Sequence, residues 1–176
     1  MFNRTPERAA ATLLVAAIVA VSFSLAARQL PKQHQPPANE YLLLLVHAKG
    51  DQIYACKSDA AQFTWTLEAP DAQLFDKDGK PFGKHSAGPS WEANDGSRVT
   101  GRAVANTPSP DAKSIPWLLI NVISHDGSGV LSGVTTILRL NTKGGKARAT
   151  GCDASHLGKE LRVPYSADYL FIYAPK

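Results

Sequence analysis

Glycine-centred turn signals recur along the chain from residue 49 onward, and they constrain its fold more than any other feature. Glycine beside aspartate, lysine or serine is typical of tight turns, because many turns need a residue with positive φ. A series of such signals between short apolar segments is typical of an all-β sandwich or barrel. The signals are Lys49-Gly50-Asp51, Asp78-Gly79, Asp95-Gly96, Asp126-Gly127-Ser128-Gly129 and Lys143-Gly144-Gly145.

The segments between these signals alternate in the way that strands do. Phe63, Trp65 and Leu67 are separated by polar side chains, which predicts a half-buried strand. Residues 116–125 carry apolar side chains on both faces, which predicts a central strand covered on both sides. We therefore expect an all-β, antiparallel sandwich or barrel, with further strands at residues 134–140 and 168–173.

Residues 41–47 form a continuous apolar run that is followed by Lys49-Gly50 and then by residues 52–56. This order predicts a hairpin with a deeply buried first strand, and periodicity alone also leaves a helix open for the run. Beyond the N-terminal segment we expect only one helical turn, within residues 153–158.

The N-terminal segment is typical of an export signal. Residues 1–8 contain two arginines, and residues 9–27 contain no charged side chain, which predicts a signal peptide cleaved after Ala26 or Ala27. If it is not cleaved, residues 9–27 form a helix close to the length of a membrane span and are the only part expected to touch a membrane. Both alternatives place the domain outside the cytoplasm, in the periplasm or secreted.

The rest of the chain divides into a linker and one domain. Residues 28–39 hold three prolines and no periodic apolar pattern, so we expect a tether there. Residues 40–176 are of single-domain size. Export permits a disulfide, and Cys56 and Cys152 are the only cysteines. A free or metal-binding pair is the alternative, but the pair lacks CxxC spacing.

Several classes of partner are not expected. The formal net charge is +4 and the basic residues are scattered, so the chain lacks the basic patch of a nucleic-acid-binding protein. No GxGxxG fingerprint is present, so we expect no nucleotide cofactor. A metal site would have to gather distant side chains without HxH or HExxH spacing, and we expect none. Those side chains are His85, His125, Asp126, Asp153 and His156.

The densest polar cluster of the domain spans residues 84–97. Its side chains could bind a ligand or supply an acid, a base or a nucleophile, or they could simply form a structural turn. A Ser-His-Asp triad is not favoured because Ser97 lacks the GxSxG elbow, and we assign no catalytic residue. The candidate ligand-binding residues are His85, Trp91, Glu92, Asp95 and Ser97. Trp91, Trp117, Tyr165 and Tyr169 could form an aromatic wall or pack in the core.

A series of motifs resembles a domain family of unknown function, whose members are secreted proteins of bacteria and filamentous fungi. The motifs are Gly88-Pro89-x-Trp91-Glu92-Ala93-x-Asp95-Gly96-Ser97-x-Val99-x-Gly101, Ile115-Pro116-Trp117-Leu118-Leu119, Asn141-Thr142-x-Gly144-Gly145, Gly151-Cys152-Asp153 and Val163-Pro164-Tyr165-x-Ala167-x-Tyr169-x-Phe171. The resemblance implies a secreted β-rich domain with a cysteine pair like Cys56 and Cys152, and it implies no catalytic residues. Arg148 departs from the pattern in a loop where a proline is expected.

These observations predict an extracytoplasmic binding or structural module rather than an enzyme. Its ligand would be a carbohydrate, an envelope polymer or a small apolar molecule. The alternative is a secreted hydrolase that uses His85, Glu92 or Asp95. The sequence leaves the oligomeric state open.

Overall fold

The structure of the chain is a computed structural model, and it describes residues 31–32, 35, 38–59 and 62–174. The predicted export helix at residues 9–27 and its cleavage positions lie outside this part of the chain, as do some residues of the predicted linker. None of the helical turns in the described ranges has the length and hydropathy of a membrane span.

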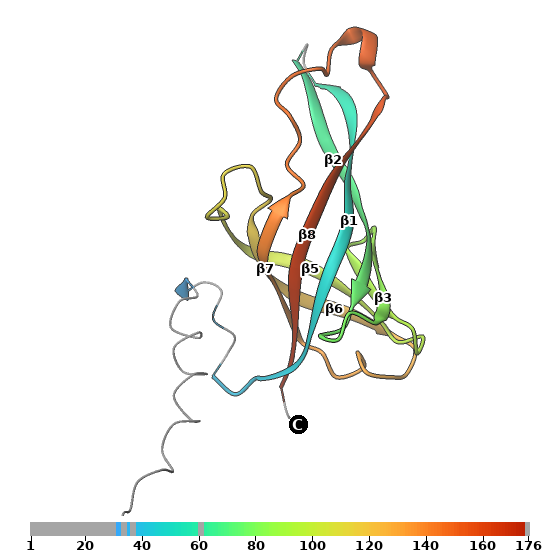
Figure 1. The fold of residues 1–176 in the computed structure, drawn as a ribbon, viewed down its shortest axis with the longest axis vertical. Coiled ribbons are helices and arrows are strands. Elements are labelled where there is room, and N and C mark those ends of the chain that lie inside the picture. Colours follow the sequence, from blue (N-terminus) through green and yellow to red (C-terminus); the bar gives the residue numbers. More distant parts are fainter. Residues whose placement is uncertain (1–30, 33–34, 36–37, 60–61, 175–176) are drawn as a thin grey trace, which may run out of the picture. The chain divides into compact units, whose positions relative to one another are not determined.

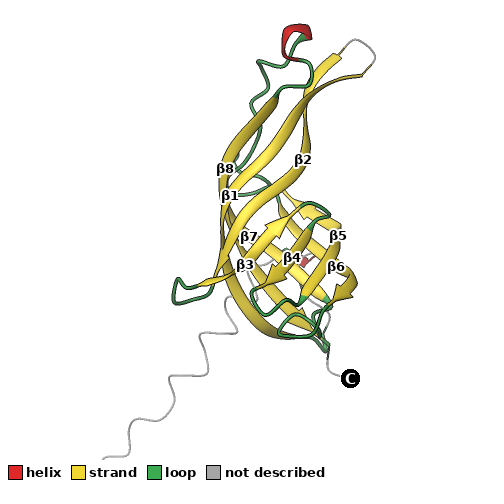
Figure 2. Cartoon of the chain, turned by 90° about the vertical axis from the view of Figure 1, so that its right-hand side faces the viewer, coloured by secondary structure: helices red, strands yellow, loops and turns green. Residues whose placement is uncertain are grey.

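The described part of the chain contains eight antiparallel strands that close into a barrel (Figure 1, Figure 2). The all-β prediction is confirmed, and of its two forms the structure has the barrel. Each strand pairs with the next, and the last pairs with the first, which closes the ring of strands. The strands are β1 (Tyr41–Asp59), β2 (Gln62–Phe75), β3 (Pro81–Ser86), β4 (Ser90–Ala93), β5 (Arg98–Thr107), β6 (Trp117–Asp126), β7 (Thr136–Gly144) and β8 (Glu160–Tyr173).

Strands β1, β2 and β8 are longer than the others and extend beyond one end of the barrel (Figure 2). β1 has 19 residues, whereas β3 has 6 and β4 has 4. β2 pairs with β3 only from Ala72 onward, so residues 62–71 of β2 pair with β1 alone. The long strands therefore form a three-stranded extension next to the closed part of the barrel.

The predicted hairpin at Lys49-Gly50 is wrong, because β1 runs straight through these residues. Gly50 pairs with Ala72 on β2 and with Tyr165 on β8. A Cβ atom at Gly50 would lie 2.1 Å from the carbonyl oxygen of Asp71. The glycine thus allows two strand backbones to approach closely and does not form a turn.

The other turn signals lie at or beside strand ends, as predicted. Asp78-Gly79 connects β2 to β3, Asp95-Gly96 connects β4 to β5, and residues 126–129 begin at the last residue of β6. The three connections contain glycines with positive φ. Lys143-Gly144-Gly145 ends β7 and opens a long loop to β8, in which η2 (Ala154–His156) is the single helical turn that the sequence predicts.

Three predictions of burial need correction. The apolar run at residues 41–47 is not deeply buried as a whole, because Tyr41, Leu42 and Leu43 are 58 %, 50 % and 40 % exposed. β6 is a strand, but Asn121 and Ile123 on its outer face are exposed, Ile123 to 56 %. A barrel wall is buried on its inner face and faces solvent on its outer face. The outer side chains of β6 are therefore exposed even though several of them are apolar. Leu67 on β2 is 51 % exposed rather than buried, because it lies on the extension.

The barrel core is built around large aromatic side chains. Trp91 on β4 packs edge-on against Tyr169 and Phe171 of β8, with ring centroids 5.5 Å and 6.4 Å apart. Gly101 on β5 makes room for this packing, because a Cβ atom there would lie 2.4 Å from Ile120 Cγ2. All four of these aromatic and aliphatic side chains are at most 2 % exposed.

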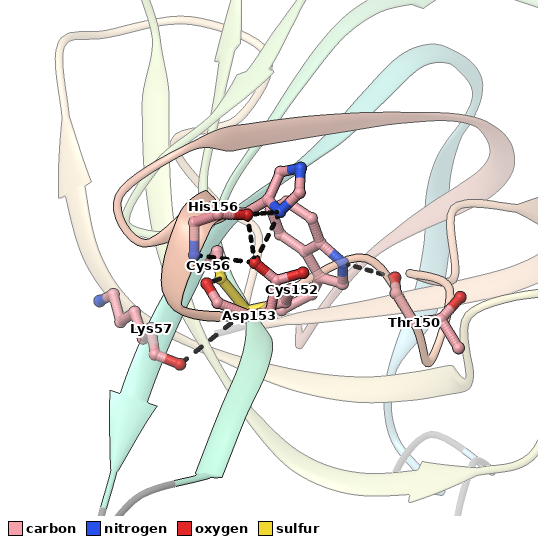
Figure 3. Close-up of polar contacts among 8 residues, drawn as sticks. Cys56, Lys57, Thr150, Cys152, Asp153 and His156 are labelled. Carbon is pink, nitrogen blue, oxygen red and sulfur yellow. Dashed lines mark hydrogen bonds and ion pairs between the residues drawn. A yellow bond between two sulfur atoms is a disulfide. The ribbon is translucent and has the colours of Figure 1, made fainter.

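The predicted disulfide is confirmed: Cys56 on β1 is bonded to Cys152 in the loop between β7 and β8, with Cα atoms 5.3 Å apart (Figure 3). Trp65 on β2 donates its indole N–H to the carbonyl oxygen of Thr150 at 3.1 Å. The Arg148 guanidinium lies 5.9 Å from the centre of the Trp65 ring. This loop is therefore fastened to the extension formed by β1 and β2.

Candidate ligand-binding cavity

A cavity of about 510 Å³ lies inside the barrel, and every strand contributes at least one residue to its lining. An eight-stranded barrel is wide enough to hold one small ligand. Small-molecule sites in proteins have volumes of this order. The size and position of the cavity therefore suit a single small molecule.

The cavity has an open mouth and a buried floor. Leu67, Gly88 and Ala103 line it and are exposed, so they mark the mouth. Trp91 and Tyr169 line it and are at most 1 % exposed, so they form the floor. Most of the lining is apolar, which favours a ligand with a large apolar part.

His85 on β3 is buried in the floor and stacked on Trp91, with ring centroids 4.4 Å apart. Its Nδ1 lies 2.8 Å from the carbonyl oxygen of Ser90. A carbonyl oxygen only accepts, so Nδ1 donates and Nε2 keeps its lone pair. Burial, together with the smaller effect of the Arg139 charge, lowers the pKa of His85 from 6.5 to about 3, although the Ser90 hydrogen bond acts in the opposite direction. The imidazole is therefore neutral at neutral pH.

Arg139 on β7 places a positive charge in the cavity wall, where it is 9 % exposed. Its Nε and Nη2 donate to the carbonyl oxygen of Pro116 at 3.1 Å and 2.9 Å. No carboxylate of the described residues forms an ion pair with it. Glu68 is the one acidic residue of the lining, and its carboxylate is paired with Lys57 at 2.6 Å.

Several buried polar atoms at or beside the floor have no hydrogen-bond partner in the described part of the chain. They are Gln52 Nε2, Trp91 Nε1 and the hydroxyl groups of Tyr165 and Tyr169. The two hydroxyls lie close to each other, to Gln52 and to Arg139, but none of these contacts has full hydrogen-bond geometry. Burial raises the pKa of both tyrosines, so both stay protonated. Two of these groups only donate and the two hydroxyls also accept, so among the described residues the buried groups at the floor have more donors than acceptors.

Of the five predicted site residues, the structure brings only His85 and Trp91 together in the cavity. They face each other across the paired strands β3 and β4. Glu92 follows Trp91 on β4 and therefore lies on the opposite face of the strand, where its carboxylate is 3.3 Å from Lys84 Nζ. The hydrolase built on His85, Glu92 and Asp95 stays a prediction, and the structure places its histidine in a different site from both carboxylates.

Asp95 and Ser97 join two connections of the barrel. Asp95 Oδ1 accepts from the Ser97 hydroxyl at 2.6 Å, and its Oδ2 accepts from the Val130 amide at 2.8 Å. Ser97 is fully buried, and its hydroxyl accepts from the Leu131 amide at 3.1 Å. The hydrogen bonds that Asp95 accepts, of which that from the Ser97 hydroxyl has the largest effect, lower its pKa. The pair ties the turn between β4 and β5 to the loop that follows β6.

The side chains that could ligate a metal do not all come together in the described part of the chain. In the described ranges, no three His, Cys, Asp or Glu side chains gather in a metal-binding arrangement. His125 donates from Nε2 to the Val134 carbonyl oxygen at 2.7 Å. His156 instead lies beside Asp153 at the start of η2, with 2.8 Å between its Nδ1 and the carboxylate (Figure 3).

Two polar residues of the cavity, Gln52 and Arg139, escaped the sequence reasoning. Arg139 lies between Leu138 and Leu140 in a segment whose alternation predicts a strand. The alternation places Arg139 on the strand face opposite the two leucines. Which of the two faces is the inner one is known only from the closed barrel. Gln52 follows the predicted turn at Lys49-Gly50, so the sequence pattern does not indicate its position on the inner face of β1.

The chain was compared with known proteins. A family model described as "Protein of unknown function (DUF3455)" matches residues 36–173. No curated protein and no solved structure matches the chain.

Proposed function

We propose that this chain, which belongs to the DUF3455 family of proteins of unknown function, is an extracytoplasmic binding module that holds one small, largely apolar molecule inside its barrel. The observation that carries the proposal is the open cavity of about 510 Å³ with a buried aromatic and polar floor. A cavity that held no ligand would lower the stability of the fold, because the side chains that line it lose packing contacts. A bound apolar ligand would restore these contacts.

The apolar lining favours a small apolar molecule over the other two ligand classes. A polymer of the envelope would need an extended groove, whereas this cavity ends at a buried floor. A carbohydrate would need many polar partners along its length, and here the polar groups gather at the floor. The ligand expected is therefore apolar along most of its length and polar at one end.

The extracytoplasmic part of the proposal rests on the sequence of residues 1–27 and on the Cys56–Cys152 bond, since disulfides persist in oxidising compartments. Residues 1–40 fused to a reporter that is active only outside the cytoplasm should give a signal. Mass spectrometry of the mature protein then separates a cleaved signal peptide from an anchor. A fusion that is active only inside the cell would contradict export.

The binding proposal is tested by titration with the neutral fluorescent probe N-phenyl-1-naphthylamine. The wild-type protein should bind one molecule of the probe with a rise in fluorescence. The variant Ala103→Trp fills the mouth and should weaken binding about tenfold or more, since a bulky side chain in the cavity excludes the probe. Val104→Trp is the matched control, because Val104 is exposed on the same strand and does not line the cavity.

The outcome is read together with a thermal melt of each variant. Equal binding by all three folded proteins would place the probe outside the cavity and contradict the proposal. Failure of the wild-type protein to bind any apolar probe would also contradict it.

A further inference from the structure

The charge of Arg139 narrows the ligand class, on the basis of the proposed binding function. We infer that the ligand is an amphiphilic monocarboxylate, whose carboxylate binds Arg139 at the floor and whose apolar chain lies along the cavity toward the mouth. Four observations on the described residues carry this inference: a buried cation without an ion pair, a set of buried donors without acceptors, their common place in the cavity lining and the volume of the cavity.

The guanidinium of Arg139 is nearly as buried as the core, yet only one neutral carbonyl oxygen, that of Pro116, accepts from it. A buried charge is costly to desolvate unless a charge of opposite sign compensates it. The one acidic side chain in the lining, Glu68, is already paired with Lys57. An anion in the cavity would supply the compensation that the described residues do not.

The buried polar atoms of the floor that have no partner among the described residues are hydrogen-bond donors, which a ligand with acceptor oxygens would satisfy. The amide Nε2 of Gln52 and the indole Nε1 of Trp91 only donate hydrogen bonds, and the protonated hydroxyl of Tyr169 donates one. Gln52 is 2 % exposed, Trp91 is 1 % exposed and Tyr169 is fully buried. A carboxylate only accepts, with about four lone-pair sites on its two oxygens. It therefore matches a floor that has donors in excess.

Arg139, Gln52, Trp91 and Tyr169 all line this cavity. The positive charge of Arg139 acts on Tyr54, His85, Tyr165 and Tyr169, lowering the pKa of each against the effect of burial or together with it. His85 is neutral and adds no second positive charge. One cation balances one negative charge, so a monoanion fits the floor better than a dianion such as a phosphate monoester.

The volume of the cavity limits the length of the ligand's apolar chain. One water molecule occupies about 30 Å³ in the liquid, and we take this volume for each heavy atom of the ligand. Decanoate has 12 heavy atoms and therefore occupies roughly 360 Å³. This is less than the cavity volume of about 510 Å³. Decanoate is therefore a suitable probe, and decanol and methyl decanoate are uncharged probes of nearly the same shape.

The test is displacement of N-phenyl-1-naphthylamine from the full-length protein at pH 8 by each of the three probes. Wild-type protein should bind decanoate about tenfold to a hundredfold more tightly than decanol, the ratio expected for a hydrogen bond to a charged group. Arg139→Gln should remove this preference and leave decanol binding nearly unchanged. Arg102→Gln is the matched control, because Arg102 is exposed and does not line the cavity.

Each outcome separates this inference from the binding proposal. Equal affinity of the wild-type protein for decanoate and decanol would overturn the monocarboxylate and leave the binding module standing. A preference for decanoate that survives in Arg139→Gln would also overturn the role of Arg139. A wild-type protein that binds neither the fluorescent probe nor any of the three decyl probes would overturn both this inference and the binding proposal. If Arg139→Gln fails to fold, Arg139→Lys replaces it as the variant. The wild-type protein still tests the inference by itself, because a wild type that does not prefer decanoate to decanol contradicts it.

Discussion

His85 and Arg139 lie in the same cavity wall, and burial affects their charges in different ways. Desolvation lowers the pKa of His85 to about 3, so the imidazole loses its charge. A guanidinium does not lose its proton in proteins, so Arg139 remains charged and unpaired. The neutral histidine completes the stacking with Trp91, while the charged arginine is available to a ligand. The two residues therefore carry separate predictions.

Stability should depend on pH through His85. Its pKa in the folded protein lies below the unfolded value of 6.5, so the unfolded chain takes up the proton first as the pH falls. The free energy of unfolding should decrease by about 1.4 kcal/mol per pH unit below 6.5, which gives about 2 kcal/mol between pH 8 and pH 5. Urea unfolding of the wild-type protein and of His85→Phe at both pH values measures this difference.

The variant should lose most of this pH dependence, whatever its own stability. The interval from pH 5 to pH 8 lies above the range in which Asp95 and Asp153 titrate, because the pKa of each is lowered from 3.8. A wild-type protein and a His85→Phe variant with the same change between pH 8 and pH 5 would contradict the buried neutral histidine.

At the scale of elements, β1 connects the cavity to the disulfide. Gln52, Tyr54 and Cys56 alternate on its inner face, and Cys56 holds the loop between β7 and β8. The Tyr54 hydroxyl donates to the carbonyl oxygen of Gly145 at 2.7 Å, in the first residue of that loop. The disulfide therefore fixes a loop that also contacts a residue of the cavity lining.

Replacing Cys56 and Cys152 together by serine should lower the melting temperature under oxidising conditions. The bond joins residues 96 apart in the sequence. The chain-entropy model gives on the order of 4 to 5 kcal/mol for closing a loop of this length, and measured values are often smaller. Thermal melts of the variant and the wild type, each with and without reductant, test this. A wild type that melts at the same temperature as the variant without reductant would contradict a stabilising bond.

The elements also show what a sequence can and cannot predict. Asp78-Gly79 and Asp95-Gly96 are turns because local chemistry alone requires positive φ there. Gly50 has the same local chemistry, but its role is set by Asp71 and Ala72 of the neighbouring strand. Close approach between strands depends on tertiary pairing, and no pattern within a few residues encodes it.

At the scale of the whole molecule, closure of the barrel creates the cavity. Closure depends on the pairing of β1 with β8, whose residues lie more than a hundred positions apart along much of the ladder. The sequence predicts strands but leaves sandwich and barrel open, because both have the same alternation. The candidate site shared this limit: the local cluster at residues 84–97 led to His85 and Trp91, whereas Arg139 and Gln52 join them only through closure.

The most direct test of the cavity as a binding site uses the three tryptophans of the chain, Trp65, Trp91 and Trp117, in a proton–nitrogen NMR spectrum. Trp91 lines the cavity, whereas neither Trp65 nor Trp117 does. Among the described residues, the indole N–H groups of Trp91 and Trp117 have no acceptor, and that of Trp65 donates to Thr150. Single Trp→Phe variants assign the three indole signals. On titration with N-phenyl-1-naphthylamine, the account predicts that the Trp91 signal shifts to saturation at one equivalent while the other two stay in place. A Trp91 signal that does not move at saturating probe, or that moves no more than those of Trp65 and Trp117, would contradict it.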